Sequence, residues 1–504
     1  MALELLGARM AAIYFGNSLY VWTSILSITV GGLAAGYFAG GYISQRYDSR
    51  KATYTAFLIT AMATLLMPGW ADFVMLKTID TGYQTGVVLS CLLFVFPIMI
   101  VLGTIPPNII KNMTTESKTA GNSTGSVYTA STVGGITTTI LVGFYIIPNF
   151  GLRSTTYIIA CILVIPPLLF FLRSRTLLSV GVILTFALTI AFGMKPEKQK
   201  PNSHVRIVYK TDGLLGQMIV ADDLNTEKRS LLVNNISQTF MHIPSRRSQW
   251  RYIHRMAMYA SMMPQGSNVL LCGIGGGNLI NEMVALGLKV DAVDLDERMA
   301  EVASKYFMMT NQVQIYEDDA RHFIRTSNKV YDIVILDMSA GENQPSNVYT
   351  LECFKEIQNL LTDQGILFLH YQNVLEGEND IAIKSIGKTM EQGGLNPQLL
   401  NTDKVNSDGD KFKWNQNGEL MLFGSKQPMT LNSEFERRDR FADPFNFPRG
   451  ANTVIKGYDF SKGMVLTDDL PIMDVLHTTT LSTTRGASIK TLVPIFIKEN
   501  IKIL

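Results

Sequence analysis

Six long apolar runs without a charged side chain dominate the first 194 residues of the chain. A helix needs about 20 apolar residues to cross the roughly 30 Å hydrocarbon core of a bilayer, and these runs hold 18 to 25 residues each. A signal peptide would supply one such run and not six. The sequence therefore predicts a multi-pass helical membrane domain, with spans at 19–43, 52–71, 84–105, 124–148, 155–172 and 176–194.

Charged residues are distributed unevenly along the 504 residues. Residues 1–194 hold 10 Lys/Arg and 5 Asp/Glu, so 15 of 194 (8 %) are charged, whereas residues 195–504 hold the other 34 and 37, or 71 of 310 (23 %). This asymmetry excludes a uniform soluble protein and a wholly embedded transporter, and an apolar content of 47 % excludes a disordered chain. A net charge of +2 offers no basic footprint, so we expect no nucleic-acid partner.

The cysteines and histidines form no metal-binding pattern. The four cysteines include no C-x-x-C pair, and the six histidines never fall at H-x-x-x-H or H-x-H spacing. Neither a disulfide framework nor a structural zinc site is expected. We therefore predict a site without a metal.

The membrane half shows a glycine pattern, a polar segment and a lack of ionisable groups, which bear on helix packing and on transport. Gly32, Gly36 and Gly40 are four residues apart and predict a helix face that a neighbouring backbone can approach closely, the alternative being the general abundance of glycine in membrane helices. The polar segment 106–126 is expected to be a loop, either a flexible linker or a gating or ligand loop. No run contains an ionisable group of the kind that coupled transporters use. Transport is therefore disfavoured, although a carrier of neutral solutes stays open.

The charged half begins after the linker KPEKQKPN. Residues 205–241 read as short strands with Asp, Gly and Asn breaks, which predict hairpins. From residue 267 strand-like segments alternate with helical segments, so we expect βαβ units and a mostly parallel sheet. The predicted organisation is a transmembrane helical domain, a linker with a small β-subdomain, an α/β domain and a C-terminal tail. Their bounds are 1–194, 195–265, 266–476 and 477–504.

Three successive strand ends in the α/β domain carry groups suited to an adenosine ligand. A glycine-rich turn lets the backbone approach a ligand without Cβ interference, and a carboxylate about 20 residues further on can accept both ribose hydroxyls. An acidic pair after the third strand could meet the adenine amino group. A ligand-free α/β scaffold is the alternative. The residues concerned are Gly273, Gly275, Gly276 and Gly277, then Asp294 and Asp296, then Asp318 and Asp319.

The glycine turn departs from the dinucleotide fingerprint G-x-G-x-x-G. Counting from Gly273, the third glycine position is occupied by Asn278. This favours a ligand without a phosphate over one with a pyrophosphate. S-adenosylmethionine or decarboxylated S-adenosylmethionine fits that requirement, as a co-substrate and not as a tightly bound cofactor.

The chain resembles the spermidine synthase (polyamine aminopropyltransferase) family, in particular its membrane-fused branch. The matching stretches include NVLLCGIGGGNLINEM, VDAVDLDERMAEVASKYF, IYEDDARHF, YDIVILDMSA and LTDDLP, and FGNSLYVWTSILSITVGGLAAGY in the membrane half. The resemblance covers nearly all of residues 2–476. It implies an α-helical membrane domain followed by an α/β methyltransferase-like (Rossmann-like) domain with a small N-terminal β-subdomain.

The resemblance also implies roles for individual residues. Asp337, after the strand VYDIVILD, falls at the catalytic Asp of the family, Gln238 in NNISQTF at its ligand-binding Gln, and His254 in YIHRM at its His. The implied reaction moves an aminopropyl group from a sulfonium to an amine. A carboxylate beside the sulfonium can orient the amine and take its proton. The alternative for Asp337 is a strand-end cap or a solvated loop acid.

Departures from the family pattern concern the amine half of the site. Two acidic positions of the soluble synthases are Gly276 and Ala340 here, and the Tyr before the family's His is Ile253. We therefore expect putrescine to be a poor acceptor, and a less charged or lipid-facing amine to be a better one. Three hypotheses remain: aminopropyl transfer, methyl transfer from S-adenosylmethionine, and a membrane protein that only binds an adenosyl ligand.

Packing roles are predicted for the remaining candidates. His322, His370 and Tyr349 are interpreted as packed or surface residues, and Trp250 and Tyr252 as contacts between the β-subdomain and the core. The turn TDDLP at 467–471 either closes over the site or caps a helix.

The expected location is the cell membrane, with the lipid bilayer as a partner. Sulfonium donors are made in the cytoplasm, so we expect the soluble half to face that side. The Lys/Arg distribution over six spans, taken alone, favours the opposite side. A homo-oligomer is left open.

Overall fold

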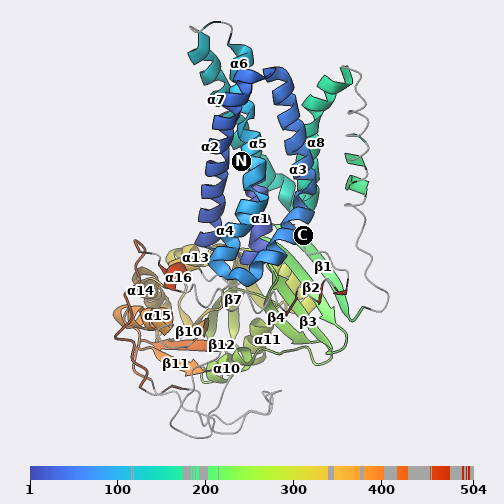
Figure 1. Cartoon of the computed structure of the whole chain (residues 1–504). Coiled ribbons are helices and arrows are strands. Elements are labelled where there is room, and N and C mark those ends of the chain that lie inside the picture. The colour runs from blue at the N-terminus through green and yellow to red at the C-terminus, as the bar shows by residue number, and fades with distance from the viewer. Residues whose placement is uncertain are drawn as a thin grey trace. The chain divides into compact units, whose positions relative to one another are not determined.

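The computed structural model describes most of the chain (Figure 1). The described residues are 1–173 except 115, 117 and 118, 203–338 except 214, 345–374, 380–401, 417–429, 457–470 and 472–476, with scattered residues at 183–191, 454–455 and 491–499. They form two units, which we call the helical unit (1–203, 210–218 and 485–504) and the α/β unit (204–209 and 219–484).

The helical unit consists of long apolar helices (Figure 1). Ser18 caps the second of them through its hydroxyl, and Asp48 caps the third through its carboxylate. The elements are α1 Ala2–Phe15, α2 Leu19–Arg46, α3 Ser49–Thr78, η1 Ile79–Thr81, α4 Tyr83–Phe94, α5 Phe96–Gly103, α6 Ile105–Met113, α7 Ala120–Ile140, the π-helix η3 Leu141–Ile146 and α8 Ile147–Arg173.

Four helical stretches of the described residues are long and apolar enough to cross a membrane: Leu19–Arg46, Ser49–Thr81, Tyr83–Met113 and Ala120–Arg173. The first three contain the first three predicted spans. The fourth holds 54 residues and contains the next two, separated at Gly151, whose backbone is not helical (φ 77°). The sixth predicted span, 176–194, lies mostly outside the described residues.

The glycine face of α2 packs as the sequence predicted. An added Cβ at Gly36 would lie 2.7 Å from the Cα of Gly103, and one at Gly40 would lie 2.7 Å from the Cα of Thr104. An added Cβ at Gly32 would lie 2.7 Å from the Cβ of Met99. The backbones of α2 and α5 therefore approach more closely than any side chain between them would allow.

The segment 106–126, expected to be a loop, is largely helical, and that prediction is wrong. Residues up to Met113 belong to α6, and α7 begins at Ala120. Threonine hydroxyls in this segment donate to carbonyls four residues earlier, Thr114 to Ile110 and Thr124 to Ala120. Such bonds satisfy polar side chains without interrupting a helix, which explains why polarity misidentified the segment.

A carboxylate directly follows the second predicted span within the same helix. The helix α3 continues past the charge-free run 52–71 and includes Asp72. The hydroxyl of Tyr14 on α1 donates to Oδ1 of Asp72 at 2.6 Å. The charge-free run ends at residue 71, but α3 continues to Thr78. A carboxylate can lie within an apolar helix when a hydrogen-bond donor satisfies it.

The first part of the soluble half forms a five-stranded sheet in the order β1-β2-β3-β4-β5. Its strands are β1 Val205–Gly213, β2 Gly216–Asp223, β3 Lys228–Val233, β4 Ile236–His242 and β5 Arg247–Ser248. The antiparallel pair β3/β4 turns at Asn234 and Asn235, which have φ of 49° and 63°. Positive φ at both central residues is the requirement of a tight hairpin turn, and asparagine tolerates it. The predicted hairpins are thus confirmed.

A seven-stranded sheet follows, in the order β11-β12-β10-β9-β6-β7-β8. The strands β8, β7, β6, β9 and β10 run parallel, and β12 is antiparallel to β10 and to β11. This is the mostly parallel, Rossmann-like sheet that the sequence predicted. Its strands are β6 Asn268–Cys272, β7 Lys289–Asp294, β8 Val313–Glu317, β9 Tyr331–Leu336, β10 Leu361–Val374, β11 Gln398–Asn401 and β12 Asn417–Ser425.

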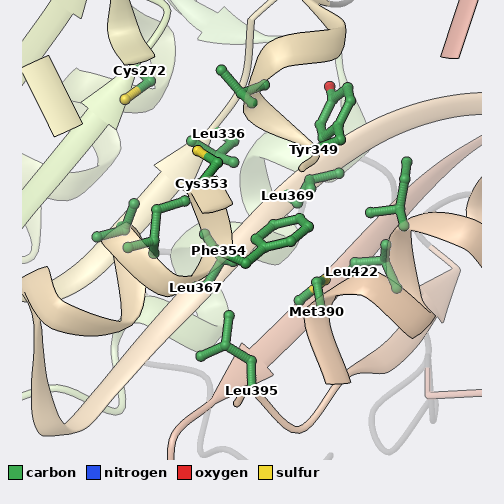
Figure 2. Packing of buried hydrophobic residues seen from close by; sticks show 14 of the residues in the cluster. Cys272, Leu336, Tyr349, Cys353, Phe354, Leu367, Leu369, Met390, Leu395 and Leu422 are labelled. Atoms are coloured by element: carbon green, nitrogen blue, oxygen red, sulfur yellow. The ribbon is translucent and has the colours of Figure 1, made fainter. Parts of the chain in front are cut away.

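Helices connect these strands. They are α10 Arg251–Ala260, α11 Asn278–Ala285, α12 Glu297–Phe307, α13 Ala320–Thr326, η4 Ser346–Val348, α14 Leu351–Leu360, α15 Ile381–Gln392 and α16 Met473–Leu476. The core beneath them includes fully buried Cys353 and Phe354 of α14, Leu367 and Leu369 of β10, and Met390 of α15 (Figure 2). Well-packed strands of this kind fix where their carboxyl ends lie.

Candidate active site

The candidate site lies at the carboxyl ends of the parallel strands. From β6 the chain adds β7 and β8 on one side and β9 and β10 on the other, so the strand order reverses at β6. Ligands of open α/β sheets bind at such a switch point, outside the carboxyl ends of the strands. The predicted residues at these ends are Gly273–Gly277 after β6, Asp294 at the end of β7, Asp318 and Asp319 after β8, and Asp337 after β9.

The glycine turn after β6 requires glycine at the positions singled out in the sequence. Gly273, Gly275 and Gly277 have φ of 96°, 52° and 72°, in the region that side chains rarely adopt. An added Cβ at Gly273 would collide with the carbonyl oxygen of Asp337, and one at Gly277 would lie 2.5 Å from Cγ of Met309. In addition, the backbone N–H of Asp337 donates to the carbonyl of Cys272 at 2.9 Å. The turn is therefore packed directly against the residue predicted to be catalytic.

Asp294 lies beside this turn. Its Oδ2 accepts the backbone N–H of Ile274 at 2.8 Å, and its Oδ1 accepts that of Asp296 at 3.0 Å. Burial raises the pKa of Asp294 to about 6, although these N–H groups favour the ionised form. Asp294 thus holds the glycine turn in position. Asp296 caps α12 by accepting the N–H of Arg298.

The two acidic residues after β8 have different hydrogen-bond partners. Asp319 caps α13 by accepting the N–H of His322 at 3.0 Å. The carboxylate of Asp318 bonds to Nδ1 of His322 at 2.7 Å, and its backbone N–H donates to the carbonyl of Asp294 at 3.1 Å. The two strand ends are therefore adjacent, as the adenosine-site prediction requires.

Asp337 forms a cluster with two side chains that the sequence analysis assigned to packing. His370 on β10 lies next to it, and Tyr252 reaches it from α10. Nδ1 of His370 is 2.8 Å from Oδ1 of Asp337, and the hydroxyl of Tyr252 donates to Oδ2 at 3.1 Å. The rings of Tyr252 and His370 are stacked, with centroids 3.7 Å apart and planes 9° apart. We call Tyr252, Asp337 and His370 the Asp337 cluster.

The sequence offered a signal for His370. It follows Leu369, which pairs with Leu336 in the parallel register, so it stands at the same level as Asp337 on the neighbouring strand. Tyr252 gave no such signal, because its contact with Asp337 joins residues 85 positions apart in different subdomains. The packing interpretation suits Tyr349 better, since it is 1 % exposed, and burial raises its pKa above the ordinary value.

Gln238 and His254, the two residues placed by resemblance, lie at the junction with the β-subdomain. Gln238 is half-buried on β4. His254 on α10 is buried, with Nε2 3.0 Å from the carbonyl of Ser248 and Nδ1 3.5 Å from Glu282. These contacts place His254 between β5 and α11.

Next to Gln238, Thr239 touches the glycine turn. Its hydroxyl accepts the N–H of Gly276 at 2.8 Å, and an added Cβ at Gly276 would lie 2.6 Å from its Cγ2. The space beside Gly276 is thus filled by Thr239. Ala340, singled out together with Gly276 in the sequence, lies outside the described residues.

The turn TDDLP is anchored to α13 and α14. Asp468 pairs with Arg321 at 3.0 Å and accepts the hydroxyl of Thr350, which itself caps α14, at 2.6 Å. The backbone N–H of Asp468 also donates to Glu352 at 3.0 Å. Of the two expectations for this turn, the contacts favour the structural one, the support of a helix start.

Comparison with known proteins shows what the chain is similar to. The spermine/spermidine synthase domain matches residues 250–399. A polyamine aminopropyltransferase 2 of Aquifex aeolicus is 22 % identical over 457 residues, which is 86 % of this chain and 87 % of that protein. Residues 250–399 thus carry a spermine/spermidine synthase domain, and most of the chain is similar to a polyamine aminopropyltransferase. Because residues 195–504 number only 310, the match of 457 residues extends into the helical unit as well.

Further polyamine aminopropyltransferases and spermidine synthases match over shorter lengths. A polyamine aminopropyltransferase 2 of Bacillus cereus is 30 % identical over 146 residues, and the chain spans 39 % of that protein. Among solved structures, a probable spermidine synthase from Corynebacterium glutamicum has a TM-score of 0.40 and 16 % identity, covering 53 % of this chain and 97 % of that one.

Proposed function

We propose that the protein is a membrane-anchored transferase that moves an alkyl group from an adenosyl sulfonium to an amine. The family default is an aminopropyl group, with decarboxylated S-adenosylmethionine as the donor. The observation that carries the proposal is the meeting of the glycine turn, Asp294, Asp318 and the Asp337 cluster at one edge of the sheet.

The donor side of the site suits a nucleoside without a phosphate. The glycine turn lets the ligand lie against backbone, and Asp294 offers a carboxylate to the ribose hydroxyls. A phosphate would lie close to the carboxylates of Asp294 and Asp318, which would repel it. A sulfonium is cationic and is favoured by the same charges.

The reaction requires little beyond positioning and proton transfer. The lone pair of the acceptor nitrogen attacks the carbon next to sulfur, the C–S bond breaks, and its electron pair stays on sulfur as a neutral thioether. The nitrogen then has a proton to lose. The Asp337 cluster lies at the strand end next to the glycine turn and contains the groups that can hold this proton.

Methyl transfer from S-adenosylmethionine is the second candidate. Thr239 fills the space beside Gly276, so a carboxylate that would bind a diamine or an aminopropyl amine is absent from that position. The donor side is compatible with either sulfonium, because both carry the same adenosyl group.

Membrane anchoring is supported by the surface of the helical unit. Large apolar side chains are exposed on it, with Val30 65 %, Phe38 85 % and Phe144 69 % accessible. Exposed apolar area of this extent is typical of surfaces that contact lipid or another protein. We infer that these helices lie in the bilayer and that the α/β unit faces the cytoplasm, where the donor is made. The acceptor is then a small or lipid-facing amine.

A product scan tests the chemistry. Purified full-length protein is incubated with each donor and a panel of amines, and the added mass distinguishes an aminopropyl from a methyl group. We expect an aminopropyl product with a weakly charged amine and a poor yield with putrescine. Transfer of methyl alone would select the second candidate, and no transfer from either donor would overturn the enzyme assignment. Asp337→Asn, which keeps the shape of the side chain, is the matched variant.

The side of the membrane is tested by labelling. Ser203→Cys places a thiol at the start of the charged half, whereas Cys91, Cys272 and Cys353 are buried. In intact cells this thiol should resist an impermeant reagent. Ready labelling would place the α/β unit outside.

A further inference from the structure

The kink of α8 creates a helix start that has no cap of its own. Gly151 is not helical (φ 77°, ψ 168°), so Leu152 is the first residue of the helical segment 152–173. The first N–H groups of a helix have no acceptor within the helix, and the side chain of the preceding residue commonly supplies one. Glycine has no side chain to offer. The acceptor for Leu152 comes instead from another part of the chain.

Asp212, 60 positions further along the chain, supplies this acceptor. Its Oδ2 accepts the N–H of Leu152 at 3.1 Å, and its Oδ1 accepts from Nε2 of Gln217 at 3.2 Å. The helix dipole also favours a carboxylate at a helix N-terminus. An added Cβ at Gly151 would lie 2.9 Å from Oδ2 of Asp212, so a side chain there would displace the carboxylate. Glycine at the kink therefore leaves room for the cap from β1.

The segment that carries Asp212 belongs to the helical unit. Residues 210–218, at the end of β1 and the start of β2, group with residues 1–203 and not with the rest of the charged half. Lys210, at the start of this segment, contributes a positive charge that acts on Asp72 of α3, as does Arg153 next to the kink. The segment thus brings a carboxylate to a helix start and an ammonium group to a carboxylate of the helices.

We propose that residues 210–218 form a strap that completes the helical unit, and that Asp212 locks this strap by capping helix 152–173. The inference goes beyond the proposed function and does not depend on which group is transferred. The strap is also the part of the five-stranded sheet that continues into the helical unit. Release of Asp212 therefore frees the start of a membrane helix and the end of a sheet together.

The competing assignment is that Asp212 serves only its own hairpin, through Gln217. The two assignments differ in what a substitution changes at a distance. A lock transmits a change at one partner to the other, with the same coupling free energy in both directions. A contact within the hairpin leaves helix 152–173 unaffected.

Hydrogen exchange of the full-length protein in micelles, measured by mass spectrometry, reports on both partners. In Asp212→Ala the first turn of helix 152–173 should exchange faster by roughly 2- to 30-fold, the range that corresponds to the loss of a helix cap. Asp212→Asn keeps one acceptor oxygen and should show a smaller increase, and it is the variant to use if Asp212→Ala does not fold. Glu227→Gln is the matched control, because this carboxylate lies between β2 and β3 and is 64 % accessible. It should leave the helix unchanged.

Gly151→Ala is the reciprocal variant. Its Cβ would displace the carboxylate of Asp212, so the strap should exchange faster although the substitution lies in α8. Alanine at a positive φ is strained in itself. Gly82→Ala controls for this strain, because Gly82 has a φ of 98° and an added Cβ would meet nothing within 4 Å. The control should leave the exchange of the strap unchanged.

A double variant separates the contact from the strain. Without the Asp212 carboxylate, the methyl group of Gly151→Ala has nothing to displace. Exchange of the strap in Gly151→Ala combined with Asp212→Ala should therefore be no faster than in Asp212→Ala alone by more than about threefold. Multiplying effects would overturn the inference, as would an unchanged helix start in Asp212→Ala or an unchanged strap in Gly151→Ala. None of these measurements uses a donor or an acceptor, so a failure of the proposed function would leave them interpretable.

Discussion

Asp294 gives the sharpest test of the donor site, because ligand binding and folding should respond to it in opposite directions. Its carboxylate accepts two backbone N–H groups, at 2.8 and 3.0 Å, and burial raises its pKa from 3.8 to about 6. Asp294→Asn keeps the shape and one acceptor oxygen but removes the charge. Asp294→Ala is a poorer choice, because it would leave the N–H of Ile274 without its acceptor, at about 1–3 kcal/mol.

The magnitude for folding follows from the raised pKa. A raised pKa means that the folded state favours the protonated carboxyl, so this contribution is fully present below pH 3.8 and is lost as the pH rises through about 6. A difference of about two pKa units corresponds to about 3 kcal/mol. Relative to Asp294→Asn, the unchanged protein should therefore lose about 3 kcal/mol of unfolding free energy between these pH values.

Removal of the Asp294 charge should have the opposite effect on ligand binding, which it should weaken. Ribose hydroxyls donate to the ionised carboxylate, and loss of a charged hydrogen-bond partner costs about 1.5–3 kcal/mol, or roughly 10–150-fold in affinity. At pH 7.5 the variant should bind the adenosyl ligand weaker by that factor. In the unchanged protein the affinity should decline as the pH falls below about 6, and in the variant this decline should be absent.

Calorimetric titration with the thioether product and denaturant unfolding, both on the full chain in micelles, measure the two effects. Asp291→Asn is the matched control, because Asp291 lies on the same strand three residues before Asp294, and its carboxylate accepts from Lys329 at 2.8 Å and Tyr331 at 2.9 Å. It should leave ligand affinity unchanged. Equal affinity of the Asp294→Asn protein and the unchanged protein at pH 7.5 would refute the assignment of the ribose to this residue.

Three further predictions concern packing. Gly276→Asp should destabilise the α/β unit by about 1–3 kcal/mol, because its Cβ would meet Thr239 at 2.6 Å; Thr239→Ser should recover part of this loss in thermal unfolding, and no loss would contradict the contact. Gly36→Leu should disrupt the helical unit, seen as a lower melting temperature in micelles, whereas Gly41→Leu, with nothing within 4 Å, should not; equal effects would argue against the glycine face. Arg321→Ala should cost about 1–3 kcal/mol in unfolding free energy, because it removes the buried partner of Glu356 and Asp468, whereas the exposed Arg325 stays beside both carboxylates; a near-neutral result would show that Arg325 and solvent replace it.

The sequence predicted best where one local requirement decided the structure. The glycines of α2 and of the turn after β6 were identified because close backbone approach and positive φ exclude other residues. Strand-end carboxylates were identified because alternating strands and helices bring such ends to one edge. Each of these features is recognisable from the few residues that surround it.

The sequence predicted less well where distant segments meet. The roles of His370 and Tyr252 depend on β10 pairing beside β9 and on α10 reaching the sheet, contacts that join residues 33 and 85 positions apart. Asp72 was missed for a related reason, because Tyr14, whose hydroxyl binds it, is 58 positions away. In each case the partner that removes the cost of burying the polar group comes from another element, which local polarity does not show.

The reversal of strand order at β6 has a consequence for anyone who wishes to alter the specificity of this enzyme. The groups assigned to the adenosyl ligand come from β6, β7 and β8, whereas the proton-handling side chains come from β9, β10 and α10. A mutant library limited to β10 and α10, with Tyr252, His254 and His370 kept, should therefore diversify the acceptor while the donor half stays intact. At Gly273 the two halves are in direct backbone contact, because an added Cβ would collide with the carbonyl oxygen of Asp337, and such a library should leave this position untouched.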